Sequence, residues 1–260
     1  MRIQHNIMAM NANRNLTFNN TQMSKNLEKL SSGYRINRAG DDAAGLAISE
    51  SMRAEIAVYD QAIRNANDGI SLVQTAEGAM TEIHSMLNRM VTLVTQGANG
   101  TYTTTDRAKL TSELTQLKSE IERIESDTQF NGKTLFGSTF SFKVGSGTSA
   151  TITTGTISKS GVSGASSLSA QSTVSSIKAY IENVNVARAT LGAVQNRLEH
   201  TVNNLGVTME NLQNAESTIR DTNVADEMMK YTKNNILIQS AQAMLAQANQ
   251  VPQGVLQLMQ

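Results

Sequence analysis

The feature that most constrains the fold is a long apolar stripe with alternating spacings of four and three residues. Its positions are Met52, Ile56, Tyr59, Ile63, Ala66, Ile70, Val73, Glu77, Met80, His84, Leu87, Val91 and Val94. Only Glu77 and His84 interrupt it. A sustained repeat of 3.5 residues indicates helices that pack along a seam, as in a coiled coil. Because a helix of about 50 residues is about 75 Å long, the stripe predicts a helical rod.

Three further stripes with this spacing predict partners for the first. One comprises Leu110, Leu114, Leu117, Ile121 and Ile124. Another comprises Ile177, Ile181, Val184, Arg188, Leu191, Gln195, Leu198, Val202, Leu205, Met209 and Leu212. The last comprises Leu237, Ala241, Met244, Ala248, Val251, Val255 and Leu258. Since a long helix cannot bury such a stripe alone, we expect the inner helices to pack on one another.

Composition agrees with thin helical seams and excludes several classes of protein. Aromatic residues make up 4% of the 260 residues, and cysteine is absent, so disulfides and thiolate metal sites are excluded. The 22 basic and 22 acidic side chains argue against nucleic acid or an anionic membrane as the main partner. No run approaches the roughly 18 apolar residues of a membrane span, and the N-terminus lacks the apolar region of a Sec signal peptide. We expect a cytoplasmic protein, or one exported by another route.

The first 30 residues are poorer in apolar side chains than the inner stripes. Ile3, Ile7 and Met10 fit a stripe, and Arg14 and Thr17 break the register between it and a second set, which comprises Leu16, Met23, Leu27 and Leu30. Asn and Gln dominate the remainder. So little apolar surface does not offset the entropy of ordering. We expect this segment to be disordered in the free chain and helical against a partner.

Two breaks separate the outer helical segments from the inner ones. Gly33 can close the first helix as a left-handed residue, and Asp41 or Asp42 can cap the next. The candidate caps at the second break are Asp221, Thr222 and Asn223. Because the outer segments have similar lengths, we expect the chain to fold back so that its two ends pair. The alternative is a pair of ordinary interhelix loops without pairing of the ends.

These breaks divide the chain into three predicted regions. A terminal coiled-coil domain comprises residues 1–42 and 221–260, and an inner helical bundle comprises residues 43–129 and 171–220. A β-hairpin and polar loop region occupies residues 130–170. The predicted fold class is therefore mainly α, a rod of long coiled-coil and bundle helices with a small β-hairpin region and disordered termini in the monomer.

The middle region differs in texture from the helical segments. β-Branched and aromatic residues alternate there with Gly, Ser and Thr, which is typical of short hairpins and polar loops. Asn131-Gly132 is a signal for a type I′ turn. The hairpin predicts an exposed surface patch. Residues 158–170 are as well explained by a flexible linker.

The sequence offers no catalytic constellation. Gly145 to Ala150 match the pattern G-x-G-x-x-A, but the residues that follow resemble a strand, whereas a dinucleotide site needs a helix N-terminus there. His5, His84 and His200 are isolated from one another, and His84 on the stripe is best explained as a packed bundle position. We expect a protein that is not an enzyme and has no cofactor or metal site.

Long motifs resemble the conserved regions of bacterial flagellin. LSSGYRINRAGDDAAGLAISESMRAEI, NANDGISLVQTAEGAMTEIHSMLNRM and DTQFNGKTLF resemble its N-terminal region. ADEMMKYTKNNILIQSAQAMLAQANQVPQGVLQLMQ resembles its C-terminal signature. The resemblance covers about residues 1–140 and 171–260, and the middle is much shorter than in many flagellins. It therefore indicates a short flagellin without large outer domains. The nearest rival is a hook-filament junction protein. An enzyme with its site in the insert is the rival from another class, but the insert is short and has no histidine.

The resemblance implies a structural protein that polymerises into the helical filament of the bacterial flagellum and is therefore secreted. It implies as partners a flagellar export chaperone, the type III export apparatus, and hook-associated and cap proteins. The expected contacts in the filament core are Leu237, Ala241, Met244, Leu245, Ala248, Val251, Val255, Leu258, Ile3 and Ile7. Stripes left unburied in a monomer would become subunit contacts in an open-ended assembly.

The resemblance also implies recognition by a host Toll-like receptor, which in the family centres on an L-Q-R-x-R-E-L-x-x-Q segment. Arg89, Leu93 and Gln96 match that segment here, and Glu113 aligns with a family contact residue. The replacement of the Arg-Glu pair by Val91-Thr92 removes one charged group of each sign. Since Arg89 and Leu93 are four residues apart on a helix, we expect them on one face. The expected result is weakened binding. The alternative is that Arg89 is only a solvated bundle residue.

Overall fold

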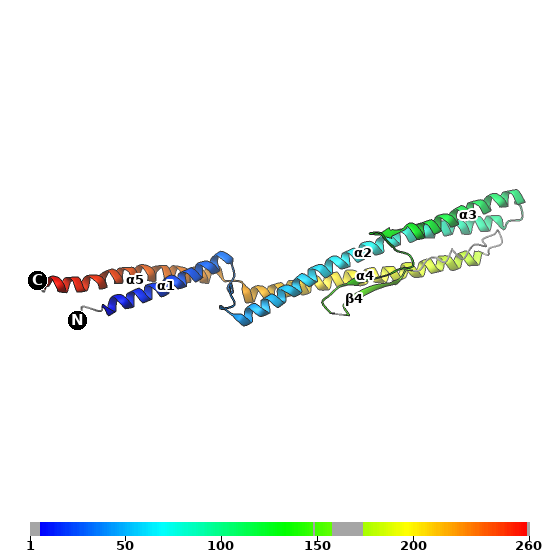
Figure 1. Ribbon diagram of the computed structural model, residues 1–260. Helices are drawn as coiled ribbons and strands as arrows, with labels where there is room; N and C mark the ends of the chain where they lie inside the picture. Colours follow the sequence, from blue (N-terminus) through cyan, green and yellow to red (C-terminus); the bar gives the residue numbers. More distant parts are fainter. Residues whose placement is uncertain (1–5, 148, 158–173, 259–260) are drawn as a thin grey trace. The chain divides into compact units, whose positions relative to one another are not determined.

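The computed structural model describes residues 6–147, 149–157 and 174–258, with side chains up to Val251. Its helices are α1 (Ile7–Ser32), α2 (Ala43–Gly97), α3 (Thr104–Asp127), α4 (Val174–Arg220) and α5 (Val224–Leu258). Its strands are β1 (Gln129–Phe130), β2 (Lys133–Thr134), β3 (Thr139–Lys143) and β4 (Thr151–Thr156) (Figure 1). The predicted fold class, mainly α with long helices and a small β region, is confirmed.

The chain divides into two compact units. We call Met1–Ala54 with Asn211–Gln260 the terminal unit, and Glu55–Glu210 the inner unit. Both α2 and α4 contribute residues to each unit. Each unit is built from segments that are distant in the sequence.

The inner unit has a continuous apolar core formed by α2, α3, α4 and the β region. Every position of the predicted inner stripes is at least partly buried. On α2 the predicted register is right for every second position, whereas the positions between them are half-buried and the buried residue lies one position earlier, as with Ile83 in place of His84 and Met90 in place of Val91. The most deeply buried members include Val73, Leu87, Ile121, Ile177 and Leu198, each with at most 1% of its surface exposed. The two polar interruptions lie at the margin. Glu77, for example, pairs with Arg188 of α4 at 3.5 Å. The packing of these stripes on one another holds the inner unit together.

The β region packs on the helices of the inner unit. Strands β1 and β2 form the predicted hairpin, and both Asn131 (φ 49°) and Gly132 (φ 75°) have the positive φ that a type I′ turn requires. Strands β3 and β4 pair antiparallel, with Phe142 opposite Ile152. Phe142 lies against Gly69 of α2, where an added Cβ would be 3.1 Å from its ring. A glycine at this point of the helix therefore leaves room for the hairpin.

Strand β4 follows Gly145–Ala150, as expected. The position that would need a helix N-terminus for a dinucleotide is therefore a strand. The linker predicted at residues 158–170 lies outside the described residues. Within the described ranges, no helix is both long and apolar enough to cross a membrane.

In the terminal unit, α1 and α5 lie side by side (Figure 1). Asn6 Nδ2 donates to the carbonyl of Ala248 at 2.7 Å, so the start of α1 is beside the distal part of α5. The two helices are thus antiparallel, and the described parts of the two ends pair as the fold-back prediction proposed. The first segment is a helix against this partner; its disorder in the free chain stays a prediction.

The predicted caps are present at both breaks. Gly33 has φ 76° and donates its N–H to Lys29 at 2.9 Å, which closes α1 in the left-handed conformation. Asp42 accepts from the N–H of Gly45 at 2.8 Å at the start of α2. Asn223 accepts from the N–H of Ala225 at 3.1 Å at the start of α5. Of the alternatives that the sequence left open, Asp42 and Asn223 are the capping residues.

The C-terminal stripe differs from its prediction at alternate positions, since Ala241 and Ala248 face α1 as predicted, whereas Ile238 and Leu245 take the places of Leu237 and Met244. The inward positions of α5 are Glu227, Tyr231, Asn234, Ile238, Ala241, Leu245 and Ala248. Leu237 and Met244, which we predicted on the seam, are 39% and 61% exposed. The prediction is therefore wrong within one chain for Leu237 and Met244, because residues 236–238 are all apolar and the spacing could not distinguish between them.

A candidate assembly surface on the terminal helices

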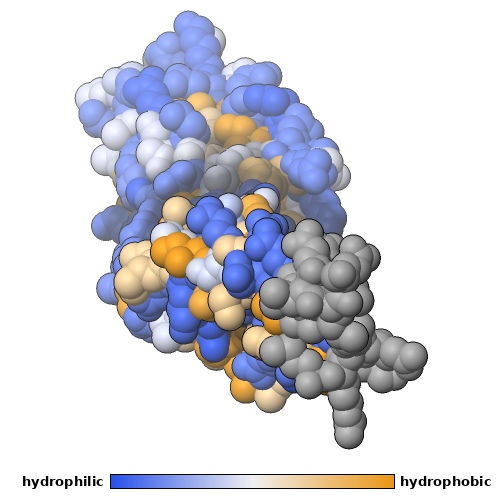
Figure 2. Space-filling view, turned by 90° about the vertical axis from the view of Figure 1, so that its left-hand side faces the viewer, coloured by the Kyte–Doolittle hydropathy of each residue, from blue (hydrophilic) through white to orange (hydrophobic). Residues whose placement is uncertain are grey.

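Exposed apolar side chains are concentrated on the terminal unit. Fourteen of the seventeen large apolar side chains that are exposed among the described residues belong to it. Those on α1 and α5 are Ile7, Met8, Met10, Phe18, Leu27, Val224, Met228, Met229, Ile236, Leu237, Met244 and Val251. Figure 2 looks onto the ends of these helices, where apolar residues in orange reach the surface between polar ones. An exposed apolar surface of this extent is typical of an interaction site.

The seam between α1 and α5 is thin. Small, polar and larger apolar side chains share its inward positions on α1, none of them fully buried except Asn26: Ala9, Ala12, Leu16, Asn19, Met23, Asn26 and Leu30. In the terminal unit, Ile36, Ile238 and Ala248 are the buried apolar side chains among those described. Small side chains bury little area, and an isolated helix pair depends on buried area for its stability. The terminal unit thus has little core of its own and much apolar surface to bury elsewhere.

A shallow groove of about 580 Å³ runs between α1 and α5. Met8, Leu237 and Met244 line it together with Asn11, Ala12, Asn15, Asn19, Ser240 and Ala241. Apolar side chains on its walls alternate with amides that can donate and accept hydrogen bonds. A groove of this kind fits a helix with a mixed apolar and amide surface, which is the composition of α1 and α5 themselves.

A buried polar cluster crosses the seam near the other end of α5. Glu227 is 4% exposed and Asn26 is 7% exposed. With its amide oriented to satisfy its partners, Asn26 donates to Glu227 Oε1 at 2.9 Å and accepts from Asn234 Nδ2 at 3.0 Å. Lys230 pairs with Glu227 Oε2 at 3.0 Å. Both carboxylate oxygens are therefore satisfied. A buried polar cluster of this kind, with its partners on both helices, fixes the register of the seam.

The connector after α1 and the end of α4 are joined by a group of four side chains and their backbone, which we call the clasp: Tyr34, Arg35, Glu50 and Arg220. The N–H of Arg35 donates to the carbonyl of Arg220 at 2.7 Å. The Arg220 guanidinium lies 4.8 Å from the Tyr34 ring centroid and pairs with Glu50 at 2.6 Å. This hydrogen bond from Arg220 lowers the pKa of Glu50. The clasp holds the ends of α1 and α4 together.

Asp41, the second acidic residue of the first break, stabilises the connector rather than the helix. Its carboxylate accepts from the backbone N–H groups of Asn37 and Arg38, each at 3.2 Å. Those hydrogen bonds lower the pKa of Asp41. The adjacent acidic pair therefore has two separate structural roles.

The ten expected core contacts fall into three groups. Leu237, Met244, Val251 and Ile7 are exposed. Ala241, Leu245 and Ala248 face α1. Ile3, Val255 and Leu258 lie outside the described side chains. The first group is therefore free to contact another molecule, whereas the second is already used within the chain.

The predicted receptor residues lie in the inner unit. Arg89 and Glu113 form an ion pair at 2.8 Å, with 53% and 43% of their side chains exposed. Gln96 donates to the Tyr102 hydroxyl at 2.8 Å. Leu93 is only 1% exposed and lies in the core, so it does not share the exposed position of Arg89, and its part in a receptor contact stays a prediction. Four residues advance a helix by slightly more than one turn, so Leu93 is rotated from Arg89 toward the core of the bundle. The accessible part consists of Arg89, Gln96 and Glu113.

Sequence reasoning missed two parts of this surface. The polar cluster of Asn26 and Glu227 was not predicted, although the spacing from Glu227 through Ile238 to Ala248 follows the same alternation of four and three. Met228 and Met229 were also missed because apolar residues off a stripe give no periodic signal. No group of three potential metal ligands occurs in the part of the chain that the structure describes.

Comparison with known proteins identifies the family. Residues 3–141 match the model of the bacterial flagellin N-terminal helical region, and residues 174–259 match that of the C-terminal helical region. A flagellin of Halalkalibacterium halodurans is 52% identical, and one of Bacillus subtilis is 44% identical. Both comparisons cover the whole of each chain.

Solved structures agree with these matches. The crystal structure of a Bacillus cereus flagellin is similar with a TM-score of 0.50 and 31% identity, over 55% of this chain and 88% of that one. A putative flagellar hook-associated protein from Vibrio parahaemolyticus has a TM-score of 0.59 over 70% of this chain and 100% of that one. At 14% identity it shows a likeness of fold alone. The two family regions and the full-length relatives establish that this chain belongs to the bacterial flagellin family.

Proposed function

We propose that this chain is a structural subunit that polymerises into the filament of a bacterial flagellum. The observation that supports this most is the concentration of exposed apolar side chains on α1 and α5. A surface of this kind on a thin helix pair is stabilised when copies of the same pair bury it. Repeated contacts between unlike surfaces of identical chains give an open helical polymer.

The proposed roles of the regions follow from this assignment. The terminal domain, residues 1–42 and 221–260, forms the filament core, and the inner bundle, residues 43–129 and 171–220, surrounds it. Residues 130–170 form a short outer surface. Within the core, the exposed residues Leu237, Met244, Val251 and Ile7 make contacts between subunits. Three other residues contribute to assembly only indirectly, because they hold α5 against α1: Ala241, Leu245 and Ala248.

Electron microscopy of the purified full-length chain tests this proposal. At salt concentrations that favour polymerisation, helical filaments should form from chain that is monomeric at low salt. Limited proteolysis of the monomer should trim it near residues 40 and 220 and leave a stable inner fragment. The same protease should leave filaments intact. A chain that stays monomeric under all polymerising conditions, or that resists trimming as a monomer, would contradict the assignment.

The export partners belong to the same proposal. A filament subunit has to leave the cell, and the family resemblance implies export through the flagellar type III apparatus, with a chaperone holding the C-terminal segment. Hook-associated and cap proteins would meet the ends of the filament. Exposed apolar residues of α5 support the chaperone role, because Met228, Met229 and Ile236 need cover before assembly.

A second candidate function is recognition by a host Toll-like receptor. The observation that favours it is the exposed ion pair of Arg89 with Glu113. We expect the monomer to bind more weakly than flagellins with the full motif, since Val91 and Thr92 supply no rim charge. Arg89→Ala should reduce affinity at least about tenfold, or about 1.4 kcal/mol.

The matched control for this test is Arg123→Ala, which removes an exposed arginine of α3 that pairs within its own helix. It should leave receptor affinity unchanged. Equal receptor affinities for the Arg89 variant and the unaltered chain would show that the family's receptor site is not present at these residues.

A further inference from the structure

The methionines of this chain are divided by exposure between the two units. Five of those with described side chains are 47–64% exposed: Met8, Met10, Met228, Met229 and Met244. All five lie on α1 or α5 of the terminal unit. In the inner unit, Met80 and Met90 are 1% and 0% exposed. The exposed sulfur atoms are thus concentrated on the candidate assembly surface.

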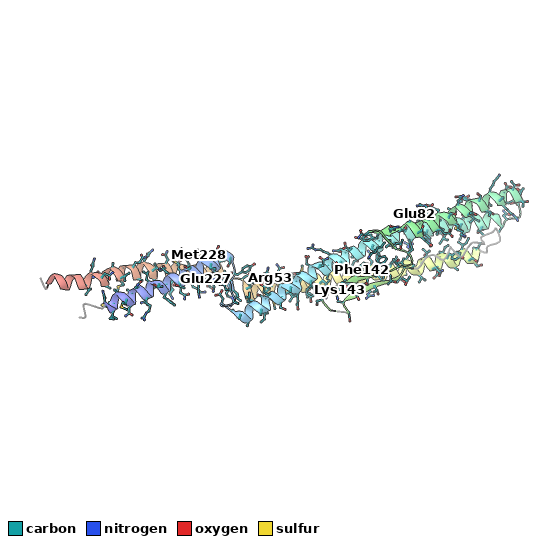
Figure 3. The ribbon with its side chains drawn as sticks, viewed as in Figure 1. Arg53, Glu82, Phe142, Lys143, Glu227 and Met228 are labelled. Atoms are coloured by element: carbon teal, nitrogen blue, oxygen red, sulfur yellow. The ribbon has the colours of Figure 1, made fainter. Side chains whose placement is uncertain are left out.

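The local setting of these methionines leaves their sulfur atoms open to small oxidants. Met8 and Met244 line opposite walls of the groove between α1 and α5. Met228 follows Glu227 on α5 (Figure 3), yet it is 47% exposed whereas Glu227 is buried. Met228 and Met229 are consecutive, so they extend the exposed apolar surface around the helix. A thioether oxidises according to its access to the oxidant, and none of these five is shielded by the core.

We propose that these five methionines are a site of oxidative modification by peroxides that acts on the free chain and blocks its assembly. The thioether sulfur attacks one oxygen of hydrogen peroxide, and the O–O bond breaks. The sulfur loses two electrons and gains that oxygen, while the displaced hydroxide takes a proton and leaves as water. The products are methionine sulfoxide and water. The reaction requires no catalytic residue and no cofactor.

The effect on assembly rests on the proposed function of this surface. Oxidation converts a flexible apolar side chain into a polar one with a strong hydrogen-bond acceptor. Burial of that acceptor between subunits without a donor is unfavourable. Once the filament has formed, the same methionines are covered, so the oxidant no longer reaches them. The modification therefore distinguishes free chain from assembled chain, and methionine sulfoxide reductases reverse it.

The first measurement needs no filament. Free full-length chain is exposed to hydrogen peroxide, and the oxidised fraction of each methionine is followed by peptide mass spectrometry. The five exposed methionines should oxidise at least tenfold faster than Met80 and Met90 in the same sample. Similar rates for the two groups, or faster oxidation of the buried pair, would overturn the proposal. This outcome is independent of whether the chain polymerises.

The second measurement follows assembly. Oxidised chain should show a critical concentration for polymerisation raised at least tenfold, and reductase treatment should restore the original value. A variant with leucine at positions 8, 10, 228, 229 and 244 should assemble equally well before and after peroxide. A control with Met80→Leu and Met90→Leu should stay as sensitive as the unaltered chain. Should the leucine variant fail to assemble at all, reductase rescue of the unaltered chain decides the question. Full assembly of chain oxidised at all five positions would overturn the proposal.

Failure of the proposed function has a different signature. Unoxidised chain would not polymerise under any condition, whereas the oxidation rates of the first measurement would be unchanged.

Discussion

The terminal unit and the inner unit are both built from long helices, but they use their apolar side chains in opposite ways. Of the 27 apolar side chains that are buried among the described residues, 24 belong to the inner unit. Of the seventeen large ones that are exposed, fourteen belong to the terminal unit. The inner unit satisfies its stripes within one chain, whereas the terminal unit leaves much of its apolar surface for other copies. The comparison predicts that changes in one unit affect folding and changes in the other affect assembly.

The largest effect should come from a charge on the assembly surface. Leu237→Asp places a carboxylate on the proposed contact between subunits, and an unpaired buried charge is costly. We expect the critical concentration for polymerisation to rise at least about 100-fold, or about 2.7 kcal/mol. Sedimentation of filaments measures it. Val186→Asp is the matched control, because Val186 is 57% exposed in the inner unit. Equal rises in critical concentration for the two variants would show that the terminal unit is not the special site of assembly.

A cavity in the inner unit should have the opposite consequence. Leu87 is fully buried, so Leu87→Ala should lower the free energy of unfolding of the inner unit by about 2–5 kcal/mol. Leu237→Ala, at 39% exposure, should change it by less than about 0.5 kcal/mol. Chemical denaturation followed by circular dichroism measures both. If Leu237→Ala destabilised the free chain as much as Leu87→Ala, the terminal unit would have a core that we have overlooked.

The polar cluster of Asn26 and Glu227 sharpens the comparison within the terminal unit. Glu227→Ala leaves one N–H of the buried Asn26 amide without an acceptor, while the other still donates to the Gln22 carbonyl at 3.1 Å; an unpaired buried donor costs about 1–3 kcal/mol. Because α1 and α5 are stabilised by assembly, we expect this loss as a lower temperature of filament disassembly. Glu227→Gln keeps an acceptor for Asn26 and should lose less. Equal behaviour of Ala and Gln variants would rule out the hydrogen bond as the cause.

Two glycines of α2 provide a smaller, internally controlled test. A Cβ at Gly69 would lie 3.1 Å from both Phe142 and Leu198, whereas one at Gly78 would meet nothing within 4 Å. Gly78→Ala should therefore stabilise the inner unit by about 0.5–1 kcal/mol through helix propensity. Gly69→Ala should lose that gain because the hairpin must move. Thermal unfolding of both variants tests this, and equal stabilisation would show that Phe142 yields without cost.

The smallest effect concerns the clasp between the connectors. The hydrogen bond from Arg220 holds the pKa of Glu50 below its usual value of 4.5. The contribution to stability is therefore present above pH 4.5 and is lost as the pH falls through the lower pKa of the folded state. Glu50→Gln should remove this part of the acid dependence. Since Glu50 is exposed, the change is small, and unfolding measured as a function of pH detects it. If the free energy of unfolding fell equally with pH in both proteins, the Glu50–Arg220 pair would make no contribution to stability.

The sequence predicted the inner stripes in part. Val73 and Leu87 are buried as predicted, but each follows an apolar residue, so the spacing left two registers open, and Ile83 and Met90 are in the core instead of His84 and Val91. The same ambiguity occurs on α5, where Ile236, Leu237 and Ile238 are consecutive and two registers are equally apolar. Glu227 and Asn26 decide between them, through a contact between residues far apart in the sequence.

Local chemistry was predictable where one residue is sufficient. Gly33 and Asn131-Gly132 adopt the positive φ that their turns require. The clasp of Tyr34 and Arg220 has no such local signal, since it depends on the two connectors meeting in space. The accessible face around Arg89 was predicted only in part, because helical spacing alone does not say which side of Leu93 faces the core.

Amide hydrogen exchange, measured residue by residue on free chain and on filaments, tests whether the inner unit is stable by itself and whether α1 and α5 are stabilised by assembly. We predict that α3 and the inner parts of α2 and α4 are protected in both states. The amides of α1 and α5 should exchange rapidly in the free chain and become protected in the filament. Protection of α1 and α5 in the free chain equal to that of the inner unit would contradict the account, as would unchanged rapid exchange of these helices after polymerisation.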